Sequence, residues 1–284
     1  MAKMSIIYKS IVMGLFFCIT FQSCTENKFI VKGEISSIQA DTTAYLIKGN
    51  AKSPTCNVII DYMYLHPSAD NDSLSHSINR ILQRITFGSN YTKNSPLEAV
   101  TSVKKDLVTQ YRNKLSEFYT ADLKEGMHED ELPSWYNHEY NIASELKLVR
   151  DSIYNFSVTN YEYTGGAHPN TTIQWVNINA NTGKELKKSD VFIEGSDKKI
   201  IQLITDHLIA EANKKLETDT ITSIDGLREN GILLNVDLYV PDFFLITEEG
   251  ISFLFNRYEI APYVVGDFQL NIPYAEIENL MKIK

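Results

Sequence analysis

The spacing of apolar residues changes several times along the chain, and each change predicts a change of secondary structure. Alternation with a period of two, rich in β-branched and aromatic residues, predicts strands in residues 28–66 and 140–180. A period of three to four residues predicts helices in residues 73–88, 95–118 and 197–216. The strand-like segments "DFFLITEEGISFLF" and "FQLNIP" follow, and a last helix is expected from Tyr274. Strands and helices come in blocks, which predicts an α+β fold with mostly antiparallel sheets.

Turn and capping residues give this pattern its boundaries. Ser95-Pro96-Leu97-Glu98 combines a capping serine, a proline at the first helical position and a glutamate at the third, which predicts a capping box. Asn181-Thr182-Gly183 predicts a hairpin turn, and Gly165-Gly166 a sharp bend. A block of strands with one long helix occurs on each side of this bend. We therefore expect two α+β subdomains, residues 29–165 and 166–284.

The beginning of the chain has the features of a secretory signal. Two lysines precede the apolar run Ile11–Phe21, which is eleven residues long and too short to cross a bilayer as a helix. The sequence Phe21-Gln22-Ser23-Cys24 then resembles the lipobox of bacterial lipoproteins, in which the cysteine is lipidated after cleavage. We expect a signal peptide in residues 1–23, a lipid on Cys24 and a tether in residues 24–28. The alternative is an ordinary signal peptide that contains a cysteine.

Charge and cysteine content restrict the partners and the chemistry. The chain has 27 basic and 36 acidic residues, and removal of the signal with its two lysines leaves a net charge of -11. Such a charge disfavours nucleic acid and anionic membrane surfaces, so membrane attachment is expected to come from the lipid. Cys56 is then the single cysteine of the mature domain. It lies in an apolar run and is expected to be a buried thiol.

Known catalytic motifs are missing from the sequence. No two of the six histidines lie closer than ten residues, and there is no HxxxH, GxSxG, P-loop or GxGxxG pattern. We therefore predict no metal and no cofactor. A pair of carboxylates could still hydrolyse a glycoside, and Glu259 and Asp267, which flank "APYVVG", are the first pair to inspect. The simpler interpretation is that both are solvated or hold a turn.

The segment "NYEYTGGAHPNT" at residues 160–171 has both structural and functional interpretations. Gly165 and Gly166 permit a positive φ, and Pro169 stiffens the exit of the bend. We expect His168 to fix the bend through a hydrogen bond to backbone or to a neighbouring side chain. The alternative is a residue at the rim of a binding surface, together with Tyr161, Tyr163 and Asn170.

The same segment carries a family resemblance. "YEYTGGAHPN", "NINANTGKELKKSDVF" and "GISFLFNRYEIAPYVVGDFQLNIPYAEI" resemble the extracytoplasmic domain of RsiV-type, lysozyme-sensing anti-sigma factors. A similar module precedes the catalytic domain of certain peptidoglycan deacetylases and stands alone in many lipoproteins. The resemblance is strongest from about residue 150 onward. We expect a cleavable signal in place of the regulator's cytoplasmic segment and membrane span, and we expect no metal-dependent domain of the deacetylase kind. The resemblance therefore implies a binding module.

Together these features predict a lipid-anchored binding module of the bacterial cell envelope, facing the periplasm or the cell surface. Its expected ligand is a lysozyme-like protein or a cell-wall glycan such as a peptidoglycan fragment. The alternatives are a carbohydrate-active hydrolase and a structural envelope lipoprotein without a small ligand, and we lean against an enzyme. The candidate ligand-binding residues are Tyr161, Tyr163, His168, Asn170, Glu259, Tyr263 and Asp267.

Overall fold

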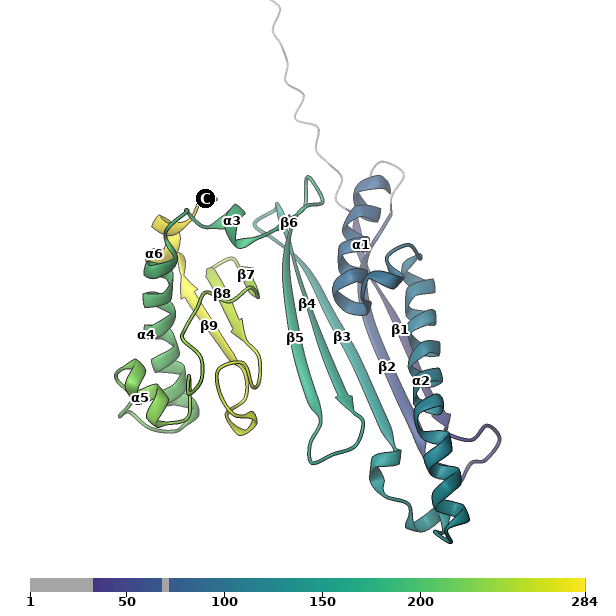
Figure 1. The fold of residues 1–284 in the computed structure, drawn as a ribbon. Helices are drawn as coiled ribbons and strands as arrows, with labels where there is room; N and C mark the ends of the chain where they lie inside the picture. The colour runs from purple at the N-terminus through teal and green to yellow at the C-terminus, as the bar shows by residue number, and fades with distance from the viewer. Residues whose placement is uncertain (1–32, 68–71, 284) are drawn as a thin grey trace, which may run out of the picture. The chain divides into compact units, whose positions relative to one another are not determined.

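The computed structural model describes residues 33–67 and 72–283, which form two β-sheets with helices (Figure 1). The strands of the larger sheet lie side by side in chain order: β1 (Glu34–Tyr45), β2 (Thr55–His66), β3 (His138–Val149), β4 (Ile153–Tyr163), β5 (Asn170–Asn179) and β6 (Glu185–Leu186). All its pairs are antiparallel except β2 and β3, which run parallel with Cys56 opposite His138. The smaller sheet contains β7 (Phe244–Ile246), β8 (Gly250–Phe255) and β9 (Phe268–Pro273), all antiparallel. The predicted α+β class is confirmed.

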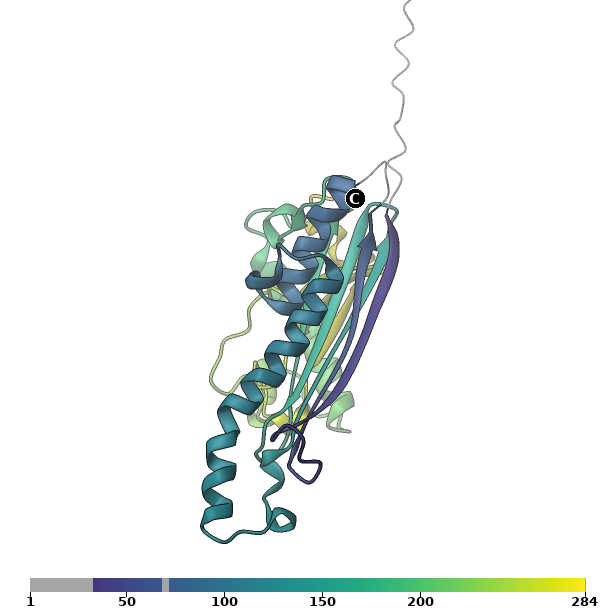
Figure 2. The ribbon, with the colours of Figure 1, turned by 90° about the vertical axis from the view of Figure 1, so that its right-hand side faces the viewer.

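Two long helices explain the single parallel pair. The chain leaves β2, forms α1 (Asp72–Phe87) and α2 (Pro96–Lys124), and returns as β3. Parallel neighbours need such a crossover because a short turn can join only antiparallel strands. Both helices cover the same face of the larger sheet (Figure 2). Three short 3₁₀ turns complete this connection, at Ser89–Tyr91, Glu129–Glu131 and Ser134–Tyr136.

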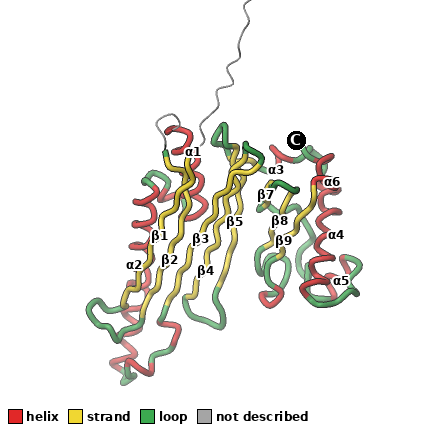
Figure 3. The backbone as a smooth tube through the Cα atoms, turned by 180° about the vertical axis from the view of Figure 1, so that it is seen from behind, coloured by secondary structure: helices red, strands yellow, loops and turns green. Residues whose placement is uncertain are grey.

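The smaller sheet has its own helical layer. It includes α3 (Lys188–Val191), α4 (Asp197–Lys215), α5 (Ile224–Glu229) and α6 (Tyr274–Ile277). The long helix α4 packs on β9, so the helices form one layer and the smaller sheet the other (Figure 3). Further 3₁₀ turns occur at Tyr263–Val265 and Glu278–Leu280. The helix expected from Tyr274 is therefore a single α-helical turn followed by a 3₁₀ turn.

The predicted boundary at residues 165 and 166 does not coincide with the change of sheet. The Gly165-Gly166 bend joins β4 to β5, which are paired from Ile153–Asn179 to Glu162–Asn170 in one continuous sheet. The chain leaves this sheet only after Leu186. The physical reason is that two glycines favour a hairpin turn as well as a linker, so the local signal does not distinguish the two. The expected signal peptide, Cys24 and tether lie outside the described residues.

The predicted capping box is confirmed at the start of α2. The Ser95 hydroxyl accepts a hydrogen bond from the Glu98 backbone N–H at 3.3 Å, and the Glu98 carboxylate accepts one from the Ser95 N–H at 2.9 Å. Both bonds satisfy backbone donors that the first helical turn leaves without partners. Cys56 is likewise buried and free in β2, as expected, and burial raises the pKa of its thiol to about 11.

Two asparagine side chains join the second sheet to β5. Asn177 is buried, donates to the Phe244 carbonyl at 2.8 Å and accepts from the Ile246 N–H at 2.9 Å. Asn256 forms the same pair of bonds with the backbone of Ile173, accepting at 2.7 Å and donating at 2.9 Å. A side-chain amide thus replaces a neighbouring strand along β5. This protects part of that strand, which would otherwise be open for pairing beyond the two-residue β6.

Candidate functional site

The hairpin between β4 and β5 is shaped by close packing against Trp135. Gly165 and Gly166 both adopt a positive φ, at 89° and 117°. A Cβ on Gly165 would lie 2.6 Å from the Trp135 Cβ, whereas one on Gly166 would meet nothing. The Tyr163 hydroxyl donates to the Gly166 carbonyl at 3.2 Å and closes the loop. The expected positive φ is confirmed, and Gly165 also permits the approach of the tryptophan.

His168 leads from this loop to a segment about ninety residues later in the chain. Its Nδ1 lies 3.1 Å from the Pro169 carbonyl, which can only accept, so Nδ1 is the donor. Its Nε2 forms a hydrogen bond with the Tyr258 hydroxyl at 2.9 Å. The ring stacks on Tyr263 with centroids 3.9 Å apart and planes 13° apart. The expected bond to backbone and to a neighbouring side chain is present, but His168 is exposed and not buried.

A cation and a second tyrosine complete what we call the aromatic cluster, which consists of His168, Arg257, Tyr258 and Tyr263. The Arg257 guanidinium lies 4.8 Å from the centre of the Tyr263 ring, in cation–π range. The rings of Tyr258 and Tyr263 are 5.7 Å apart. Tyr258 is 58% exposed, so the cluster is accessible to a partner while its members hold one another in place.

The other two predicted tyrosines, Tyr161 and Tyr163, lie beside this cluster. Partial burial raises the pKa of Tyr161, and the next contributions come from the nearby Glu139 carboxylate and the hydroxyl groups of Tyr263 and Tyr163. Tyr161 therefore lies near both the loop and the cluster. Four predicted residues therefore gather at this end of the sheet, namely Tyr161, Tyr163, His168 and Tyr263. Asn170 is exposed at the first position of β5 and is paired with Glu162.

The predicted carboxylates have local structural partners. Glu259 accepts a hydrogen bond from the Asn256 backbone N–H at 2.7 Å through one oxygen and one from the Tyr239 hydroxyl through the other. Burial and this carboxylate raise the pKa of Tyr239. Asp267 accepts from the Gln269 amide at 3.3 Å. Glu259 thus holds the turn that carries Arg257 and Tyr258, which matches the structural interpretation of this residue.

Arg257, Tyr258 and Trp135 are not among the residues predicted from the sequence. The first two lie in the segment "NRYEIAPY", next to two residues that were selected. Their role depends on the direction in which each side chain leaves a tight turn, and Tyr258 itself has a positive φ of 65°. A positive φ in an aromatic residue is uncommon and is not indicated by the local sequence.

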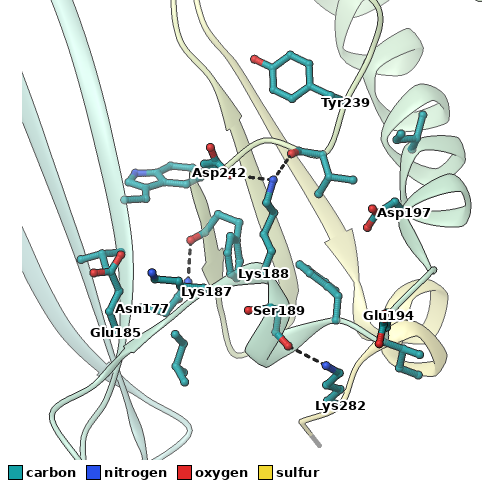
Figure 4. Close-up of a pocket in the computed structure, with 18 of the residues that line it drawn as sticks. Asn177, Glu185, Lys187, Lys188, Ser189, Glu194, Asp197, Tyr239, Asp242 and Lys282 are labelled. Carbon is teal, nitrogen blue, oxygen red and sulfur yellow. Dashed lines mark hydrogen bonds and ion pairs between the residues drawn. The ribbon is translucent and has the colours of Figure 1, made fainter.

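A separate pocket of about 990 Å³ lies where the chain passes from β5 and β6 into α3 and β7 (Figure 4). Trp175 and Tyr239 contribute aromatic rings to its lining. The Lys188 ammonium group is fixed by the Val240 carbonyl at 2.7 Å and the Asp242 carboxylate at 2.8 Å. Lys282 similarly donates to the Ser189 carbonyl at 2.8 Å. None of the predicted site residues lines this pocket. Its lining comes from segments that are far apart in the sequence and share no recognisable motif.

Within residues 33–67 and 72–283, no group of three or more His, Cys, Asp or Glu side chains is placed to hold a metal ion. None of the helices in this same part of the chain is both long and apolar enough to cross a membrane.

Comparison with known proteins places this geometry in a structural context. Residues 189–275 match the family model DUF3298, described as a protein of unknown function, and residues 50–171 match the model Deacetylase PdaC. A crystal structure of a DUF3298 family member from Bacteroides fragilis has 28% identity and a TM-score of 0.78, covering 88% of this chain and 94% of its own. This chain is similar to DUF3298 proteins.

A second solved structure shares only the fold. A DUF3298 family protein from Pseudomonas aeruginosa has 14% identity and a TM-score of 0.56, covering 88% of this chain and 95% of its own. No curated protein matches the chain at a significant level. The predicted resemblance thus extends to DUF3298 and PdaC, while the RsiV-type relationship stays a hypothesis.

Proposed function

We propose that this protein is a lipid-anchored binding module of the cell envelope that recognises a lysozyme-like protein through the aromatic cluster. The observation that carries the proposal is the stack of the exposed His168 on the half-buried Tyr263 and Arg257, beside the exposed Tyr258. Tyrosine, tryptophan and arginine are enriched among the residues that dominate protein interfaces.

The contacts within the cluster favour tight recognition. Two rings and a guanidinium are held by stacking, and Tyr258 is held by its bond to His168. Side chains that are already ordered lose less entropy when a partner binds. Val264 adds an apolar side chain that is 89% exposed next to Tyr263. The surface therefore offers a fixed aromatic core and an apolar neighbour.

Charge and relationship support the choice of partner. The chain has a formal net charge of -9, and such a charge accelerates association with a cationic protein. The PdaC match extends over residues 50–171, which include β4 and the turn that follows it. This match supports an accessory role connected with the cell wall.

Binding of a lysozyme to the immobilised protein tests the proposal. We expect Tyr263→Ala, which removes the centre of the stack, to weaken binding by about tenfold or more. Phe118→Ala is the matched control, because Phe118 is a 59% exposed aromatic residue on α2. Wild-type protein that does not bind lysozyme at low ionic strength, or equal effects of the two variants, would contradict the proposal.

The pocket supports a second candidate, a cell-wall glycan. Trp175 and Tyr239 can stack on sugar rings, and the charged groups beside them can bond hydroxyl and amide groups. Titration with peptidoglycan fragments tests this, with loss of binding expected for Trp175→Ala and not for Tyr263→Ala. The opposite result would assign the glycan to the aromatic cluster.

The membrane anchor and the hydrolase alternative need separate tests. Cys24→Ser is expected to release the protein from the membrane fraction, and a variant that still sediments with membranes in high salt would contradict lipidation. Wild-type protein is expected to leave peptidoglycan and chitin oligomers intact. Turnover that disappears with Glu259→Gln or Asp267→Asn would instead support the hydrolase.

A further inference from the structure

The first strand of the larger sheet has a long free edge. β1 pairs with β2 residue by residue from Glu34–His66 to Tyr45–Thr55, with no bulge. No other described strand lies on its opposite side. β1 contains no proline, lysine or arginine, the residues that commonly block an edge. Alternate residues of this twelve-residue strand therefore direct backbone N–H and C=O groups to a side with no strand partner among the described residues.

The direction of the free backbone groups follows from the ladder. The Leu46 N–H donates to the Pro54 carbonyl at 2.8 Å, so even-numbered residues face β2 and odd-numbered residues face away. Two side chains of α2 agree with this assignment. Arg112 donates to the Tyr45 carbonyl at 2.9 and 3.0 Å, and Lys104 reaches the Asp41 carbonyl at 3.5 Å. The outward carbonyls therefore lie on the side of the strand that α2 flanks.

A groove of about 590 Å³ runs between this edge and α2, and it is strongly cationic. Its charged lining residues are Lys48, Lys104, Lys105 and Arg112, and no aspartate or glutamate lines it. None of the ion pairs among the described residues involves these four cations. In a chain with more acids than bases, this local excess of positive charge indicates an anionic partner.

The spacing of the cations matches that of an extended chain. Lys104 and Arg112 are eight residues apart on a helix, about 12 Å. The carbonyls that they contact belong to Asp41 and Tyr45, four residues apart on a strand, about 13 Å. Helix and strand thus run side by side in register. Alternate side chains of a strand added to β1 would meet this row of cations.

We propose that β1 accepts an extra strand from a partner polypeptide that carries aspartate or glutamate at alternate positions. Backbone N–H groups of the added strand replace Lys104 and Arg112 at the outward carbonyls. The released cations then face the partner's carboxylates. Main-chain bonds supply affinity in this mode of recognition, and the charged groove supplies selectivity.

Fluorescence polarisation with labelled eight-residue peptides tests both parts of the proposal. The probe alternates threonine and glutamate, and the control peptide alternates threonine and lysine. A third peptide is the probe with N-methyl groups on alternate residues, which removes the N–H groups of one edge. We expect the probe to bind and both other peptides to bind about tenfold more weakly or less. A probe that does not bind at millimolar concentration overturns the proposal.

Variants of the protein localise the binding. Thr43→Pro removes an outward N–H and keeps the β2 ladder, because proline is tolerated where an edge N–H faces away. We expect it to weaken probe binding about tenfold, whereas Thr43→Ala has little effect. Lys105→Glu should also weaken binding, with Lys147→Glu on β3 as its control. Unchanged melting temperatures would show that the variants are folded.

Three further results would overturn the proposal. Equal binding of the N-methylated peptide would indicate a simple anion site. The same conclusion would follow if inorganic polyphosphate displaced the probe while Thr43→Pro had no effect. A wild-type dimer in sedimentation that Thr43→Pro converts to a monomer would assign the edge to a second copy of this chain.

Discussion

The two sheets of this protein are each covered by a long helix, but their interiors differ in chemistry. The core of the larger sheet contains five buried tyrosines, one cysteine and the neighbouring buried His138. Among the described residues, the core of the smaller sheet contains no buried tyrosine, histidine or cysteine and is built from aliphatic residues, phenylalanine and Met281. The buried polar side-chain atoms without a hydrogen-bond partner among the described residues all belong to the first region: Asn57 Oδ1, Tyr62 Oη, Ser75 Oγ and His138 Nε2.

This difference indicates which region's stability responds to pH and which responds to the loss of side-chain volume. An apolar interior responds to loss of volume, whereas a buried polar group responds to loss of a partner or to a change of charge. We therefore expect the larger sheet to determine the pH dependence of stability. The smaller sheet depends on its junction with β5, because the bonds of Asn177 and Asn256 attach it there.

The largest effect is expected from breaking that junction at Asn177. Asn177→Ala leaves three buried groups without partners, on Asn155, Phe244 and Ile246, which costs about 3 to 5 kcal/mol. Asn256→Ala exposes two backbone groups of Ile173 that are only partly buried, and about 1 kcal/mol is expected. Urea unfolding of both variants gives the difference. Equal costs would mean that the buried contacts of Asn177 stabilise the protein no more than the partly buried contacts of Asn256.

Acid is expected to destabilise the first region through His138. Burial, with a smaller contribution from the Lys114 charge, lowers the pKa of this histidine from 6.5 to about 4. The unfolded chain therefore binds a proton between these pH values that the folded chain does not, so the free energy of unfolding falls as the pH falls from 6.5 to 4. The full change is about 3 kcal/mol. His138→Phe should remove this part of the pH dependence, and an unchanged slope in denaturant titrations would show that other groups cause it.

Much of the fold could be predicted from the sequence, because its signals are local. The capping box at Ser95, the long helix through Ile200 and Leu208, and the period of two in β9 all act within a few residues. The boundary between the sheets could not be predicted, because Asn177 and Asn256 pair with backbone that is distant in the sequence. Contacts between residues that are distant in the sequence also form the aromatic cluster. Tyr161, Tyr163 and His168 could be grouped because they are close in the sequence, but their meeting with Tyr258 and Tyr263 depends on tertiary structure.

The hairpin offers a smaller effect that separates conformation from packing. Gly165 and Gly166 share a positive φ, so alanine strains both positions. Only Gly165→Ala also places a Cβ 2.6 Å from Trp135. We expect it to be about 1 to 3 kcal/mol less stable than Gly166→Ala, a difference within the range of overpacking. Thermal melts of the two single variants provide the measurement, and identical melting temperatures would mean that Trp135 moves away without cost.

The smallest effect compares the first turns of the two long helices. Ser95 accepts from the Glu98 N–H in a capping box, whereas the Ser196 hydroxyl before α4 donates backward to the Ile193 carbonyl at 2.6 Å and caps no helical N–H. Ser95→Ala removes an acceptor for a helix donor, and about 0.5 to 2 kcal/mol is expected. Ser196→Ala leaves the Ile193 carbonyl with its second donor, the Ser196 backbone N–H at 3.1 Å, so a smaller loss is expected. Chemical denaturation of both variants tests the order. A larger loss for Ser196→Ala would mean that its buried hydroxyl stabilises the start of α4 more than a capping box stabilises α2.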